Sequence, residues 1–263
     1  MFQRIIKNLS HPKYAFLYMK DKISRVIFYI LLLTTIMSLP VIIVSIFNPS
    51  SLIPSKGEIT NSIDGMVSYD VEIVNNKLNS SNNHYIDMGM FKIIVGNVSI
   101  SDPGYILKFD DEAIITYLSA GNGIVIETNK VTYESLNIND LEFSRINIIK
   151  VTNLIMLGFS NDNAIITSLV LSGFLINLFD LVMIILILSL FASLLKVMPI
   201  KFGDHFKINT YITTIYAVIS LILTLFNLME LSIIALIITY IYQNMAYRSI
   251  KIIRKVEVKN KDE

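Results

Sequence analysis

Asp180 is the one acidic residue within a long apolar run of the sequence, and Asn177 lies one helical turn before it. A carboxylate inside a membrane span is costly unless it is paired or hydrated, so it marks a candidate functional site. Counted back from Lys196, Asp180 lies about 24 Å along a helix, in the outer leaflet and not at the midplane. The pair could bind a coupling ion or a substrate. Polar packing or snorkelling of Asp180 is the structural alternative, and contact with a partner helix within a complex is the third.

No other group of residues has the spacing of a known catalytic or metal site. The acidic run 110–112 lacks the alternating ligands of a calcium loop and fits a solvated turn. The three histidines are far apart in the chain, and cysteine is absent. Zinc-protease, phosphate-loop and serine-hydrolase motifs are also absent. The sequence therefore predicts no catalytic residues, no metal site and no cofactor, and we expect a protein that is not an enzyme.

The composition excludes an ordinary soluble protein. Apolar residues make up 53% of the 263 residues and charged residues 16%, and the mean hydropathy is +0.60. A soluble domain typically has about 25% charged residues, and a clearly positive mean hydropathy indicates several lipid-facing segments. The formal net charge of +1 gives no indication of a nucleic-acid partner.

Four apolar runs are candidates to cross a bilayer, which takes about 20 helical residues. They cover 26–47, 164–195, 211–227 and 231–247. The first contains Pro40, which should kink the helix, and it is longer than the apolar core of a cleaved signal peptide. The last two are near the short limit and form a hairpin that turns at 228–230.

The positive charges predict the orientation of these spans, because Lys and Arg collect on the cytoplasmic side. The arm 1–25, the loop 196–210 and the tail 248–263 together hold 15 of the 22 Lys and Arg but only five of the 21 acids. The stretch 48–163 holds the other seven bases and 14 of the acids. We therefore expect a multi-pass protein of the cell membrane, with both termini in the cytoplasm and 48–163 outside.

The stretch 48–163 is long enough for one small domain. Segments rich in β-branched residues predict strands at 66–74, 91–100, 105–109, 112–118 and 130–134. Asn122-Gly123 predicts a two-residue hairpin turn, the polar run 75–83 predicts a loop, and a helix is expected from Asn139. The expected fold class is four transmembrane α-helices with a small β-rich α+β extracytoplasmic domain between the first and the second.

The first 25 residues form an N-terminal arm. Phe2, Ile5, Ile6 and Leu9 have the spacing of one helical face, with cations on the other, as is typical of a helix lying on an anionic inner leaflet. The segment 10–12, which reads Ser-His-Pro, should break this helix and begin a second one that leads into the first span. Membrane anchorage is the simple interpretation of the arm, and docking of a cytoplasmic partner is the alternative.

The order of these segments resembles a known family. The resemblance rests on Ser10-His11-Pro12-Lys13-Tyr14 in the arm, on Leu39-Pro40 in the first span, and on Gly123-Ile124-Val125-Ile126 to Lys130-Val131 in the outside domain. Over nearly its full length the chain is similar to domain-of-unknown-function family 1189, a group of multi-pass membrane proteins of low-GC Gram-positive bacteria. Some members carry a maltodextrin-utilisation label, so the resemblance implies an association with sugar uptake. It implies no catalytic residues.

Two functions fit the sequence. The first is an accessory or sensory membrane protein whose outside domain binds a ligand or partner, in contact with a transporter, with another membrane protein or with further copies of itself. The second is a small transporter or channel subunit that uses Asp180 and Asn177. The spans show few polar residues besides these two, which favours the first function.

Overall fold

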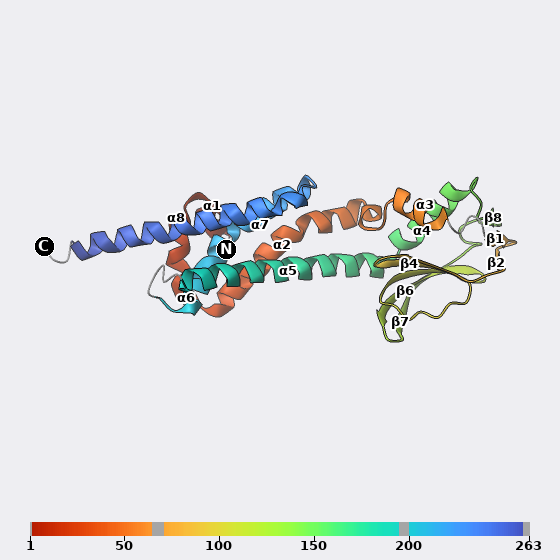
Figure 1. Ribbon diagram of the computed structural model, residues 1–263, viewed down its shortest axis with the longest axis horizontal. Helices are drawn as coiled ribbons and strands as arrows, with labels where there is room; N and C mark the ends of the chain where they lie inside the picture. Colours follow the sequence, from red (N-terminus) through yellow and green to blue (C-terminus); the bar gives the residue numbers. More distant parts are fainter. Residues whose placement is uncertain (1, 65–70, 195–199, 260–263) are drawn as a thin grey trace. The chain divides into compact units, whose positions relative to one another are not determined.

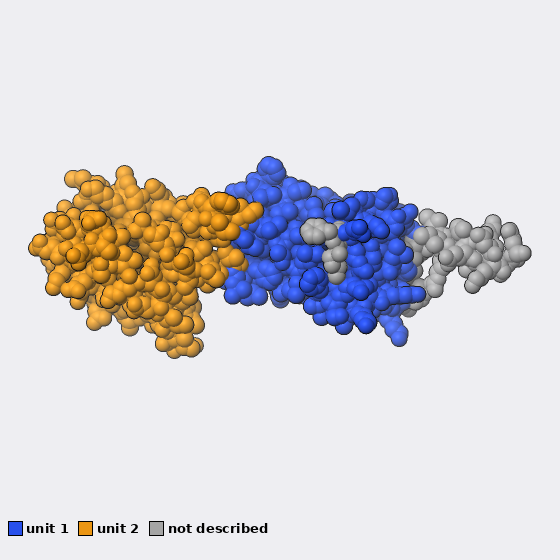
Figure 2. All heavy atoms as spheres, turned by 180° about the vertical axis from the view of Figure 1, so that it is seen from behind, with its two compact units in different colours: residues 1–42, 171–263 blue, residues 43–170 orange. Residues whose placement is uncertain are grey.

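The computed structural model describes residues 2–64, 71–194 and 200–259. The chain divides into two compact units, which Figure 2 shows in different colours. Unit 1 comprises residues 1–42 and 171–263, and unit 2 comprises residues 43–170. Each unit has a buried hydrophobic cluster of its own.

Unit 1 is helical (Figure 1). Its elements, two of which begin or end in unit 2, are α1 (Phe2–Ser10), η1 (Pro12–Lys20), α2 (Ile23–Phe47), α5 (Asn163–Leu194), α6 (Phe202–Ile212), α7 (Thr214–Leu225), η4 (Met229–Leu231) and α8 (Ser232–Lys259). Both α2 and α5 are mostly apolar and have no distinct polar face, as expected of helices that face lipid as well as neighbouring helices. Tyr29, Leu33, Leu181 and Tyr211 are fully buried in the cluster between them and α6.

Three helical stretches are long and apolar enough to cross a membrane: Ile23–Phe47, Asn163–Leu194 and Phe202–Leu225. The first two agree closely with the predicted spans 26–47 and 164–195. The third starts nine residues before the predicted start of 211–227, because the expected loop 196–210 is helical from Phe202 onward. The predicted fourth span, 231–247, begins at the last residue of η4 and continues in α8, whose second half carries polar residues. It is not among the three stretches and stays a prediction.

The N-terminal arm packs against the rest of unit 1. The break at 10–12 is confirmed, since α1 ends at Ser10 and Pro12 opens a 3-10 helix. Elements α1 and η1 contact α6, α7 and α8. Ile5 is 7% exposed within the hydrophobic cluster, whereas Ile6 is 62% exposed. Part of the face that the sequence assigned to lipid is therefore buried in protein.

Unit 2 is an α+β structure with two sheets. The three-stranded sheet has the order β2-β1-β8, formed by β1 (Val71–Val74), β2 (Lys77–Ser80) and β8 (Asp140–Glu142). The five-stranded sheet runs in chain order through β3 (His84–Met88), β4 (Phe91–Val95), β5 (Gly104–Phe109), β6 (Ala113–Gly121) and β7 (Ile124–Thr132). Only the pairing of β4 with β5 is parallel among the strand pairs described.

Helices complete unit 2. The helical elements are η2 (Pro49–Leu52), α3 (Lys56–Ile63) and α4 (Ile148–Ser160). A capping box opens α3, because the Ser55 hydroxyl accepts from the Glu58 amide while the Glu58 carboxylate accepts from the Ser55 amide. Helix α4 packs on β5 and β6, and the Phe159 ring stands edge-on to Phe91 on β4 with 5.2 Å between ring centres.

The hairpin turn at Asn122-Gly123 is confirmed, with φ of 54° and 80° at its two residues. The expected loop 75–83 is wrong in part, because it contains β2. Asn75 and Asn76 have φ of 52° and 62° and form a second tight turn between β1 and β2. Asparagine tolerates this left-handed region, so an Asn-Asn pair turns the chain much as Asn-Gly does.

Other strand predictions differ at their ends. Gly96, with φ of 79°, ends β4 five residues before the predicted 100. Of the predicted strand 130–134, residues 130–132 are the end of the longer β7 and residues 133–134 lie in a turn. The helix expected from Asn139 begins only at Ile148, because residues 140–142 form β8. Strand β3 was not predicted. Residues 66–70 of the predicted strand 66–74 lie outside the described residues, and 71–74 form β1.

The packing of α4 on the sheet gives a first testable prediction. A Cβ atom on Gly158 would lie 2.5 Å from Leu107 Cδ1, and Leu107 is fully buried. Gly158→Ala should therefore destabilise unit 2 by about 1–2 kcal/mol through overpacking. Gly57→Ala in α3 is the matched control, because nothing lies within 4 Å of its Cβ position and alanine should stabilise that helix by about 0.5–1 kcal/mol. Thermal unfolding followed by circular dichroism measures both, and equal stability of the two variants would contradict the packing.

Candidate functional site

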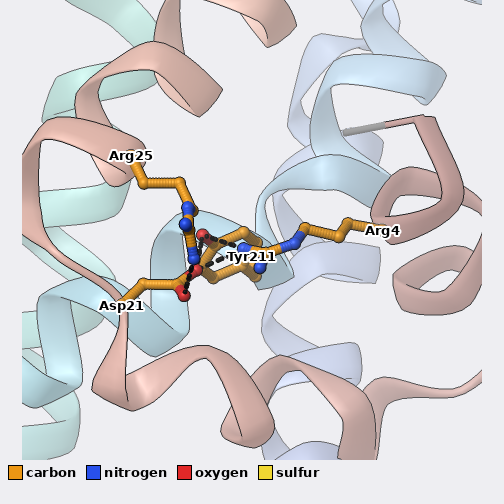
Figure 3. Close-up of polar contacts among 4 residues, drawn as sticks. All are labelled: Arg4, Asp21, Arg25 and Tyr211. Carbon is orange, nitrogen blue, oxygen red and sulfur yellow. Dashed lines mark hydrogen bonds and ion pairs between the residues drawn. The ribbon is translucent and has the colours of Figure 1, made fainter.

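The most highly connected charged group in unit 1 is a cluster of four residues that we call the arm clasp: Arg4, Asp21, Arg25 and Tyr211 (Figure 3). The Asp21 carboxylate accepts hydrogen bonds from Arg4 Nη1, from Arg25 Nη1 at 3.0 Å and from the Tyr211 hydroxyl at 2.5 Å. The Asp21 side chain is only 9% exposed. One carboxylate thus joins α1, the start of α2 and α6.

The Arg4 guanidinium is held on several sides. Its Nη1 donates to the Tyr211 hydroxyl at 3.0 Å, and its Cζ lies 4.3 Å from the centre of the Tyr18 ring. The Tyr211 ring in turn packs between Tyr18 and Tyr29, with ring centres 4.7 and 4.6 Å away. A planar guanidinium suits this arrangement, because it can pair with a carboxylate and stack on an aromatic ring at once.

The electrostatics of the clasp keep Asp21 charged. Burial raises the pKa of this carboxyl, but the hydrogen bonds from Arg4, Tyr211 and Arg25 outweigh burial and lower it below its usual value. The pKa of Arg4 is raised, because the pairing with Asp21 outweighs the opposing effect of burial. At neutral pH the clasp is therefore a fixed ion pair, and it is suited to holding the arm in place more than to exchanging protons.

Two further contacts attach the arm and the start of α2. The Tyr242 hydroxyl on α8 donates to the backbone carbonyls of Asn8 and of Leu9, the latter at 2.8 Å. The Tyr29 hydroxyl on α2 lies 2.7 Å from Thr214 Oγ1 on α7. The hydroxyls of Tyr211 on α6 and Tyr242 on α8 therefore form hydrogen bonds with polar groups of the arm.

The predicted pair on α5, Asn177 and Asp180, makes two separate contacts. The Tyr216 hydroxyl on α7 donates to Asp180 Oδ2 at 2.6 Å, and Asn177 Nδ2 donates to the Ser38 hydroxyl on α2 at 3.0 Å. Each polar group thus has a neighbouring helix as its partner, which is what polar packing requires. Whether the pair also forms a functional site stays a prediction.

A buried polar network near the other end of α5 was not predicted. Asn209 on α6 donates to the Ser189 hydroxyl at 3.1 Å and accepts from Gln243 Nε2 on α8 at 3.0 Å. Gln243 Nε2 also donates to the Leu188 carbonyl at 2.9 Å. All three side chains are at most 4% exposed. Asn209 lies in the loop 196–210 that was predicted from the sequence, so its contribution to the interior of unit 1 was missed.

In unit 2 a buried carboxylate, Asp162, was also missed. It is 1% exposed. Its Oδ2 accepts from the hydroxyls of Thr116 on β6 and Thr128 on β7, and its Oδ1 accepts from the amides of Ala164 at 2.8 Å and Ile165 at 3.2 Å. Asp162 therefore caps α5 and ties it to the last two strands of the sheet. An acid directly before a long apolar helix is a helix-start signal that could have found it.

The acidic run 110–112 makes surface ion pairs. Lys108 lies 2.7 Å from Asp110, and Lys77 lies 3.4 Å from Glu112. Within the described residues, no group of three or more His, Cys, Asp and Glu side chains is placed to hold a metal ion.

Unit 2 also has a cavity of about 440 Å³ between α4 and the segment that joins β7 to β8. Its lining residues are Leu136, Asn137, Ile138, Asp140, Leu141, Lys150, Asn153, Leu154 and Leu157. The side chains of Asn137, Lys150 and Asn153 make no hydrogen bond or ion pair with any other residue that the structure describes. A mostly apolar lining with a few polar side chains that can bond to a ligand is typical of a ligand-binding site.

These features place the chain in a broad class, that of proteins with helices able to cross a membrane and an α+β unit inserted between two of them. The chain belongs to DUF1189, a family described as a protein of unknown function, whose profile matches residues 2–247. The family resemblance expected from the sequence is thereby confirmed. No curated protein and no solved structure matches the chain.

Proposed function

We propose that this protein is a non-enzymatic accessory or sensory component of the cell membrane. In this proposal both termini are cytoplasmic, and the α+β unit lies outside the cell, where it binds a ligand or a partner. The division of charge along the sequence supports this orientation, since bases dominate both ends and acids dominate 48–163.

The observation that carries the proposal is the cavity of unit 2, whose polar groups are available to a ligand. Helix α5 joins unit 2 to the helical unit along the chain. Its residues Ile165 and Ile166 belong to the core of unit 2, while Ile184, Ile185 and Leu188 belong to the core of unit 1. One helix therefore contributes side chains to the hydrophobic cores of both units.

The link to maltodextrin uptake is a proposal that rests on the family resemblance. The nine lining residues of the cavity include no aromatic ring, and most of them are aliphatic. Such a lining suits the apolar part of an amphiphile or peptide better than a sugar. We therefore propose that the link is made through association with a sugar transporter, and not through sugar binding in this cavity.

A second candidate function is a small transporter or channel subunit that uses Asp180 and Asn177. The network of Ser189, Asn209 and Gln243 favours it, because it adds buried polar groups to the helical unit beyond those the sequence suggested. Against it, Asp180 and Asn177 are each bonded to a different neighbouring helix.

Asp180→Asn distinguishes the two candidates. If the protein is an accessory component, a deletion strain that takes up labelled maltodextrin slowly should be restored by Asp180→Asn to within about twofold of wild type, because only one partly exposed hydrogen bond changes character. Uptake by cells with equal amounts of each variant is the measurement. Tyr216→Phe, which removes the same hydrogen bond without removing the charge, is the matched control. Failure of Asp180→Asn alone to restore uptake would favour the transporter.

A further inference from the structure

The N-terminal arm carries a cationic surface, because its one acidic residue is enclosed in the arm clasp. Residues 1–25 contain six Lys and Arg and one acid, Asp21. Because Arg4, Arg25 and Tyr211 enclose that acid, the outward charges of the arm are cations. Lys20 and Lys22, on either side of Asp21, are exposed and make no ion pair with any residue of the described chain.

An apolar stripe begins directly beside these cations. Ile23, Ile27 and Leu31 follow one another at four-residue intervals on α2 and are 55%, 51% and 40% exposed, and the neighbouring Phe28 is 56% exposed. Residues four apart lie on one helical face. Exposed cations next to an exposed apolar stripe match the two parts of an anionic phospholipid. The cations suit its charged head group, and the stripe suits its acyl chains.

From this juxtaposition we propose that the junction of η1 and α2 is a binding site for an anionic phospholipid. The ammonium groups of Lys20 and Lys22 contact the phosphate, together with the outward side of Arg25, and an acyl chain lies along Ile23 and Ile27. This goes beyond the function proposed above and does not depend on it. The sequence placed the lipid contact of the arm on α1, but part of that face is buried in protein. The proposal places the contact at the junction of η1 and α2 instead.

The clasp explains why the site is selective for charge. A free Asp21 would repel a phosphate placed between Lys20 and Lys22. Its three hydrogen bonds direct the carboxylate inward, and the lowered pKa of Asp21 keeps it paired with Arg4 at neutral pH. The folded arm therefore presents a net positive surface to any head group at this position.

Native mass spectrometry of the full chain, released from detergent with phosphatidylglycerol or phosphatidylcholine added, tests the proposal. Each Lys near an anionic lipid strengthens binding about fivefold, so the double variant Lys20→Gln/Lys22→Gln should bind phosphatidylglycerol about 25-fold more weakly. Its binding of phosphatidylcholine should change little. The matched control is Lys77→Gln/Lys130→Gln, which removes the same charge from exposed positions of unit 2.

Three results would overturn the proposal. The first is equal loss of phosphatidylglycerol binding in both double variants, which would indicate only a general effect of net charge. The second is equal affinity of the wild type for the two lipids. The third is competition by millimolar inorganic phosphate, which would indicate a free anion as the ligand and not a lipid. Hydrogen exchange of the arm confirms that each variant keeps its fold.

Discussion

Replacing Asp21 with alanine should release the N-terminal arm from the helical unit. The substitution removes three hydrogen bonds at once and leaves Arg4 beside aromatic rings without its anion. Breaking a buried ion pair costs about 3–5 kcal/mol and an exposed one less than about 1 kcal/mol. Since Asp21 is 9% exposed but Arg25 is 51% exposed, we expect a cost of about 2 kcal/mol, between these limits.

Limited proteolysis with trypsin measures this release, because Lys7 and Lys13 are exposed residues of the arm. When cleavage follows local opening, a cost of about 2 kcal/mol makes cleavage about thirtyfold faster. Arg4→Ala should have nearly the same effect, and the double variant should be little worse than either single one, because both remove the same interaction.

Asp204→Ala is the matched control for this prediction. Asp204 is an acid of the same helical unit, but its ion pair with Lys207 is 3.8 Å long and partly exposed, so its loss should change stability by less than about 0.5 kcal/mol. If trypsin cleaves the arm of Asp21→Ala no faster than that of Asp204→Ala, the clasp does not hold the arm.

The clasp should also depend on pH in a defined direction. The pKa of Asp21 is lowered in the folded protein, so the clasp contributes fully above the usual carboxyl pKa of about 4 and loses its contribution as the pH falls through the lower folded value. Protection of the arm in the wild type should be constant from about pH 5 to 8 and should decrease in strong acid. Asp21→Ala should lack this additional decrease.

The long apolar helices were predicted accurately from the sequence, because a run of apolar residues is a local feature of the chain. A long apolar run is visible within one stretch of sequence, so α2 and α5 lie within three residues of the predicted bounds at each end. The turn at Asn122-Gly123 is equally local, since two adjacent residues must adopt positive φ. The family resemblance also depended on such local features and on their order.

What the sequence could not predict depends on residues that are distant in the chain. Asp21 and Tyr211 are 190 positions apart, and Asn209 and Gln243 meet only because α6 packs against α8. From the sequence alone, a polar residue such as Asn209 is assigned to a loop, because its distant partner is not known. The isolated acid between Lys20 and Lys22 was a usable signal, because a single carboxylate among bases is well placed to pair with one of them.

Replacing Asp162 with alanine should have the largest effect in unit 2. The change removes the cap of α5, which is worth about 1 kcal/mol, and leaves the hydroxyls of Thr116 and Thr128 without their charged acceptor. Hydrogen bonds to a charged group contribute about 1.5–3 kcal/mol each. The two hydroxyls have backbone carbonyls as second acceptors, Asn129 O at 3.4 Å and Thr116 O at 3.0 Å. We therefore expect a total cost of about 3 kcal/mol, below the simple sum.

Hydrogen exchange measures this effect by segment, which is useful because the chain has no tryptophan to report unfolding. A cost of about 3 kcal/mol corresponds to exchange more than about a hundredfold faster in the core amides of β6, β7 and the first turns of α5. Asp162→Asn should cost less than Asp162→Ala, because asparagine caps a helix as well as aspartate does and threonine hydroxyls can accept from its amide. Asp111→Ala, at an exposed position of the same unit, should leave exchange unchanged. Equal exchange in Asp162→Ala and Asp111→Ala would show that the carboxylate does not tie α5 to the sheet.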